Sequence, residues 1–68
     1  MSKIEFQLNL FKGSEFLDIP NMQKNFLSES SAKTAIKHSK VLLQKHGATH
    51  FEIIEHRESF NSKGKFTI

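Results

Sequence analysis

The chain has 68 residues, a formal net charge of +3 and a mean hydropathy of −0.44. This length predicts one domain, residues 1–68, close to the lower limit at which a core alone stabilises a fold, so a partner or a dimer would add stability. The absence of cysteine excludes disulfides and thiolate metal sites, and no apolar run is long enough for a membrane span or a signal peptide. We therefore expect a soluble cytoplasmic protein that makes no contact with membranes.

The first predicted element is a half-buried strand over residues 3–11, where apolar and polar residues alternate. Gly13 and Ser14 then fit a two-residue hairpin loop of the type that needs glycine first. Such a loop sets a register in which apolar residues meet apolar residues. The predicted pairs are Lys12 with Glu15, Phe11 with Phe16, Leu10 with Leu17, Asn9 with Asp18 and Leu8 with Ile19. Pro20, which has no N–H to donate, ends the second strand or marks it as an edge, and an irregular connection follows over residues 21–25.

A single helix is predicted from Ser28 to Gly47. Its core-facing residues recur every three or four positions and fall on one stripe, made of Ala32, Ala35, Ile36, Ser39, Leu42, Leu43 and His46. Ser28 is a good N-cap, and Leu27 is expected to pack on Ala32 beside the first turn. Gly47 supplies the residue with positive φ that ends the helix, and Ala48 is expected to pack back on the last turn.

Residues 49–57 form the third predicted strand, with Phe51 and Ile53 on its core face. Residues 61–64 are predicted to form a turn whose glycine is placed for a bulge, and residues 65–68 to return as a short last strand. The resulting order is ββαββ. It predicts an α+β fold in which one helix packs on one face of a small antiparallel sheet while the other face stays open, with the strand order undetermined.

The sequence contains no pattern typical of catalysis. It has no nucleophile elbow, no glycine-rich phosphate loop before a helix and no carboxylate pair in an apolar run. We therefore expect neither an enzyme nor a cofactor. His46 and His50 have the only ligand-like spacing among the histidines, but Gly47 breaks the helix between them and a structural zinc site needs four ligands, so we expect no metal site.

The helix also predicts a basic face, because Lys33, Lys37, Lys40 and Gln44 lie three or four positions apart along it. The charge is unevenly divided along the chain. Residues 1–30 carry three lysines and four acids, a net −1, whereas residues 31–68 carry seven basic residues and three acids, a net +4. Such asymmetry favours an anionic partner, although lysines on an exposed helix face are usually just solvated.

Two further groups complete the predicted partner-binding residues. The basic residues of the C-terminal hairpin are Arg57, Lys63 and Lys65. Phe11 and Phe16, together with Ile54, point to the open face of the predicted sheet. Rings on such a face can stack bases or seed a protein interface, or they can fold over the hairpin as ordinary strand-end residues.

One part of the chain resembles a known group of proteins. The run Ser28-x-x-x-Ala32-Lys33, followed by His46-Gly47-Ala48-Thr49 and Ile54-Glu55, is similar in layout to small phage-encoded inhibitors, in particular anti-CRISPR proteins that act on type I CRISPR surveillance complexes. Small phage inhibitors of host RNA polymerase have a comparable strand, helix, strand layout. The resemblance covers less than half of the chain and omits the N-terminal hairpin. It implies a basic inhibitor acting in the host cytoplasm, with Lys33 and Lys37 as contact residues.

Three functions are compatible with these patterns. The first is a non-enzymatic inhibitor that docks through its basic surface on a protein or nucleoprotein complex of the host with an anionic or nucleic-acid-binding surface. The second is direct nucleic-acid binding, with the helix lysines and those of the C-terminal hairpin on phosphates. The third is a dimeric structural or interaction protein joined through the open face of the sheet. The sequence does not name the partner, since lysines bind phosphate and carboxylate alike.

Overall fold

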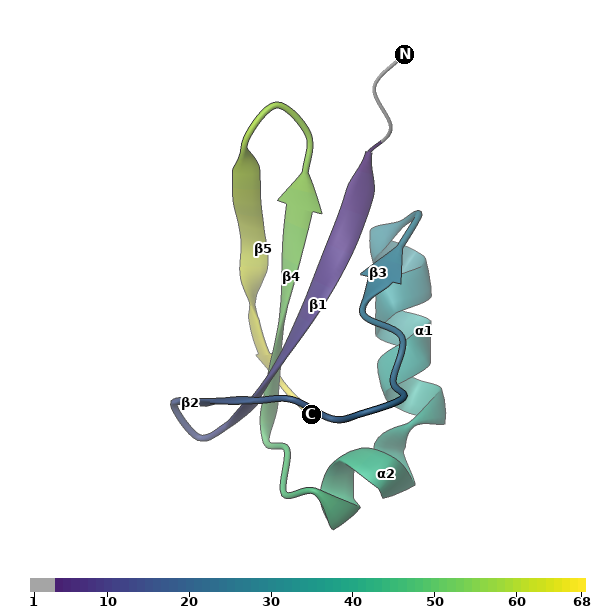
Figure 1. The fold of residues 1–68 in the computed structure, drawn as a ribbon, viewed down its shortest axis with the longest axis vertical. Helices are drawn as coiled ribbons and strands as arrows, with labels where there is room; N and C mark the ends of the chain where they lie inside the picture. Colours follow the sequence, from purple (N-terminus) through teal and green to yellow (C-terminus); the bar gives the residue numbers. More distant parts are fainter. Residues whose placement is uncertain (1–3) are drawn as a thin grey trace.

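Five antiparallel strands and two helices form the fold of residues 4–68, the part of the chain that the computed structural model describes (Figure 1). The elements are β1 (Glu5–Lys12), β2 (Glu15–Leu17), β3 (Asn25–Phe26), α1 (Glu29–His38), α2 (Lys40–Lys45), β4 (His50–His56) and β5 (Phe60–Thr67). The sheet has the order β2-β1-β4-β5, and β3 also pairs with β1. The α+β class and the antiparallel sheet are confirmed. The predicted element order ββαββ is incomplete, because the structure has one more strand, β3, and one more helix, α2. Lys3, in the first predicted strand, lies outside the described residues.

The β1–β2 hairpin forms around Gly13 and Ser14 as predicted. The three pairs nearest the loop are confirmed, namely Lys12 with Glu15, Phe11 with Phe16 and Leu10 with Leu17. Gly13 has a φ of 64°, which is the conformation that the first position of this loop requires. The turn chemistry and the apolar pattern therefore agree on one register.

The two predicted pairs farther from the loop, Asn9 with Asp18 and Leu8 with Ile19, do not form. β2 ends at Leu17, and the fully buried side chain of Ile19 enters the core instead of continuing the strand. β3 pairs with the part of β1 that β2 does not reach, and the Leu8 N–H donates to the carbonyl of Lys24 at 2.7 Å. The connection predicted to be irregular thus contains a short strand, because the backbone groups of β1 need partners there.

The single helix predicted over residues 28–47 is wrong, because the chain changes direction at Ser39. This residue has φ −105° and ψ 15°, and α2 runs away from the axis of α1 beyond it (Figure 1). Serine has a lower helix propensity than alanine or leucine, because its hydroxyl competes for backbone hydrogen bonds. The break lets Leu43, 0% exposed, reach the same core as Ile36, while Val41 remains 82% exposed.

The two outer ends of the helical segment match their predicted caps. The hydroxyl of Ser28 accepts a hydrogen bond from the backbone N–H of Ser31 at 3.1 Å. At the other end Gly47 has a φ of 78°, and the Ala48 N–H donates to the carbonyl of Leu43 at 2.9 Å, as in a Schellman motif. The predicted packing of Leu27 on the first turn is wrong, since this side chain is 71% exposed.

The β4–β5 hairpin is longer than predicted. β5 begins at Phe60, so the turn lies at residues 57–59 and the predicted turn at 61–64 is part of the strand. The earlier turn allows Phe60 to pair with His56 and to stack its ring on the imidazole at 4.1 Å between centroids. Gly64 does mark a bulge. Between the Glu52–Lys65 and Ile54–Ser62 pairs, two residues of β5 lie opposite one residue of β4.

The core lies between one face of the sheet and the two helices. β1 and β4 contribute Leu8, Leu10, Phe51 and Ile53, the helices contribute Ala32, Ile36 and Leu43, and Ile19, Phe26 and Ala48 complete the buried cluster. We call the opposite face of the sheet the open face; it holds the odd-numbered residues of β1, the even-numbered residues of β4 and their partners on β2 and β5.

Leu43→Ala should lower the free energy of unfolding by about 2–4 kcal/mol, because the side chain is fully buried and its removal leaves a cavity. Leu42→Ala is the matched control, since Leu42 is 37% exposed, and its loss should stay near or below about 1 kcal/mol. Urea unfolding followed by circular dichroism measures both values. Equal losses in the two variants would contradict the orientation of α2.

Candidate functional site

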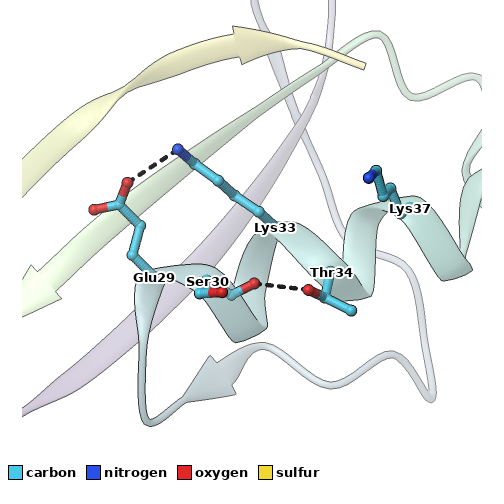
Figure 2. Close-up of a pocket in the computed structure, with 5 residues that line it drawn as sticks. All are labelled: Glu29, Ser30, Lys33, Thr34 and Lys37. Carbon is cyan, nitrogen blue, oxygen red and sulfur yellow. Dashed lines mark hydrogen bonds and ion pairs between the residues drawn. The ribbon is translucent and has the colours of Figure 1, made fainter.

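The strongest candidate for a binding site is one exposed face of α1. Five residues of this helix, Glu29, Ser30, Lys33, Thr34 and Lys37, line an open hollow (Figure 2). They come together because residues three and four positions apart share one face of a helix. We call this face the lysine surface.

Within the lysine surface the two lysines are held differently. The Lys33 ammonium lies 3.1 Å from a carboxylate oxygen of Glu29 and 5.2 Å from the centroid of the Phe66 ring. Lys37 has no acidic oxygen within 4.0 Å among residues 4–68. The Thr34 hydroxyl donates to the carbonyl of Ser30 at 2.9 Å, and its oxygen remains able to accept. The surface therefore offers one paired and one unpaired ammonium group beside hydroxyls.

The predicted basic face does not continue along the helices. Lys40 is the first residue of α2 and Gln44 lies farther along it, and both side chains are exposed. Because α2 leaves the axis of α1 at Ser39, neither residue lines the hollow on α1. Of the four residues predicted to form this face, only Lys33 and Lys37 come together.

Two of the predicted basic residues belong to a separate cluster around Glu55. The carboxylate of Glu55 lies 3.5 Å from the guanidinium of Arg57 and 3.8 Å from the ammonium of Lys63. The Glu55 side chain is only 13% exposed, so it holds both cations close to the sheet. The one carboxylate of Glu55 thus offsets one of the three positive charges predicted for this hairpin.

The remaining predicted residues, Phe11, Phe16 and Lys65, meet on the open face. The two rings pack edge to face with centroids 6.1 Å apart, and the Lys65 ammonium lies 4.0 Å from the centroid of Phe11. Phe16 is 59% exposed. The predicted partner-binding residues thus divide into three groups, and this group lies across the sheet from α1.

Sequence reasoning missed a row of hydrogen-bonded polar side chains on the open face. His56 shares a hydrogen bond with the amide oxygen of Gln7 at 2.8 Å, and the amide nitrogen of Gln7 donates to Asn9 at 2.8 Å. Ser62 donates to a carboxylate oxygen of Glu52 at 2.8 Å. Strand alternation indicated the face of each residue, but only the register between strands shows which of them meet.

Neither helix in residues 4–68 has the length or the apolar character needed to cross a membrane. Within the same residues no three histidine or carboxylate side chains are grouped so that they could hold a metal ion. Comparison of the chain with protein-family models, curated proteins and solved structures finds no match.

Glu29→Gln should increase retention of the protein on a heparin column, because it removes the carboxylate that offsets Lys33. Glu58→Gln is the control, since it makes the same charge change at an exposed residue of the β4–β5 turn. We expect the Glu29 variant to elute at higher salt than the Glu58 variant and to lose only about 0.3–0.5 kcal/mol of stability. Identical elution would mean that α1 is not the preferred anion-binding face.

Proposed function

We propose that this chain is a small, non-enzymatic binding protein that docks through the lysine surface of α1 on an acidic patch of a larger partner. The observation that carries the proposal is the position of Lys33 and Lys37 on one exposed helix face, around a hollow that also holds two hydroxyl groups (Figure 2). The two ammonium groups and the Ser30 hydroxyl can donate hydrogen bonds to carboxylates, whereas the Thr34 hydroxyl already donates to the carbonyl of Ser30. Among the described residues that line this hollow, Glu29 is the one acid beside Lys33 and Lys37, so the hollow carries a net positive charge.

A protein partner is favoured over nucleic acid by the distribution of the other cations. A nucleic-acid site follows the phosphate backbone with a row of lysines and arginines. Here Arg57 and Lys63 are paired with Glu55, and Lys65 lies over the ring of Phe11 on the open face. The lysine surface therefore suits a compact acidic patch, and direct nucleic-acid binding is the alternative.

The partner we propose is a nucleic-acid-handling complex of a host cell, such as a type I CRISPR surveillance complex, with this chain as a phage-encoded inhibitor. The support is the resemblance carried by residues 28–33, 46–49 and 54–55. Channels that hold nucleic acid are themselves basic and would repel the lysine surface. Docking would therefore occur at an acidic patch outside such a channel.

Replacing Lys33 and Lys37 together by Glu should weaken partner binding at least about a hundredfold, because attraction becomes repulsion at an acidic interface. Both side chains are exposed, so the circular dichroism spectrum should not change. The double variant Lys12→Glu with Lys45→Glu is the control, since it makes the same charge change at exposed residues outside the hollow. Equal affinities of the two double variants would contradict the proposal.

The partner itself can be recovered with the tagged protein from a host lysate, half of which is treated with nuclease. Recovery that survives nuclease supports a protein partner, and loss of the partner supports nucleic acid. Salt dependence gives a second test, because log affinity for duplex DNA falls with log salt by about 0.9 for each phosphate neutralised. A shallow dependence agrees with a protein interface that is only partly charged.

A further inference from the structure

A second surface, the open face of the sheet, is not used by the proposed docking. Phe16 on β2 and Phe60 on β5 are 59% and 75% exposed. They lie at opposite edges and opposite ends of this face, because Phe16 pairs with Phe11 at one end of β1 and Phe60 pairs with His56, the partner of Glu5, at the other. Ile54 lies between them and is only partly buried.

We propose that the open face is the interface of a homodimer, in which the sheets of two copies stack face to face. A two-fold axis in the plane of the sheet can place Phe16 of each copy near Phe60 of the other. Each exposed ring then covers an aromatic ring of the partner and both leave water. Such a symmetric arrangement needs apolar groups at two corners of one face, which is what the register provides.

Five polar side chains of the open face can be covered at a reduced cost, because they already bond to one another. Gln7 bonds to both Asn9 and His56, and Ser62 bonds to Glu52, each at 2.8 Å. Burying a polar group is costly chiefly when it loses its hydrogen-bond partner. Donors already used within the chain are also poorly suited to reading the edges of nucleic-acid bases.

The charges of the open face favour a second copy over a polyanion. The face carries Glu5, Glu52 and Lys65, a formal charge of −1, on a chain whose net charge is +3. Two lysine surfaces would repel each other, whereas two open faces approach with little net charge. Glu52 and Lys65 are cross-strand partners, so the face presents both signs and can complement itself.

The size of the face sets the expected strength of the dimer. The strands β2, β1, β4 and β5 hold 3, 8, 7 and 8 residues. At about 3.3 Å per residue and about 4.8 Å between strands, they cover roughly 400 Å² in projection. A standard stable interface buries about 800 Å² on each partner. We therefore expect a weak dimer that exchanges with monomer at micromolar or higher concentrations.

Sedimentation equilibrium from about 10 μM to about 1 mM tests the proposal, because dimer formation depends on concentration. The mass of the wild type should rise from 7.8 kDa toward twice that value. The double variant Phe16→Ser with Phe60→Ser should associate at least about tenfold more weakly. Val41→Ser is the matched control for Phe60→Ser, since Val41 is 82% exposed on α2, and it should associate like the wild type.

Three results would overturn the proposal. The first is a wild-type mass of 7.8 kDa throughout the concentration range. The second is equal weakening of the dimer by the single variants Val41→Ser and Phe60→Ser. This comparison replaces the double variant as the test if circular dichroism shows that the double variant is misfolded. The third is a monomeric wild type that binds oligothymidine through Phe16 and Phe60, which would assign the face to nucleic acid. The Lys33→Glu with Lys37→Glu variant should dimerise normally, so the two proposals fail separately.

Discussion

The pairing of β1 with β4 is the constraint on which the rest of the structure depends. Seven cross-strand pairs, from Glu5 with His56 to Phe11 with His50, join strands from opposite ends of the chain. Because side chains alternate along a strand, this one register directs Leu8 and Ile53 to the core and Gln7 and Ile54 to the open face. The helices, the short strands and the last strand then attach to surfaces that this pairing has defined.

The sequence was a good guide wherever one residue and its neighbours decide the structure. Gly13 fixed the hairpin loop, Ser28 the helix start and Gly47 the helix end, because each acts through its own backbone or a contact three residues away. The helix break at Ser39 and the extra strand β3 escaped prediction. Both depend on distant partners, the break on the core that receives Leu43 and β3 on vacant backbone groups of β1.

The same distinction explains the outcome for the candidate site. Lys33 and Lys37 could be found from the sequence because one turn of α1 separates them. The contact of Lys63 with Glu55 and the position of Lys65 over Phe11 could not be found, because they depend on how β5 pairs with β4 and β4 with β1. The β4–β5 turn was mispredicted, because residues 61–64 contain Asn, Ser and Gly whereas Ser59 is the one typical turn former in residues 57–59. The additional strand pairs favour the earlier turn.

The bulge in β5 has a consequence for how chains can associate. β5 is an eight-residue strand at the end of the sheet order, with no further strand beside it among residues 4–68. Such an edge can template edge-to-edge growth into aggregates, because its outer N–H and C=O groups are free. Gly64 distorts this edge with a φ of 116°, and it lies between two lysines, Lys63 and Lys65. A strand β5 of another copy would meet an irregular hydrogen-bond ladder and would bring lysines of the same charge. The bulge therefore protects the β5 edge from pairing with further strands.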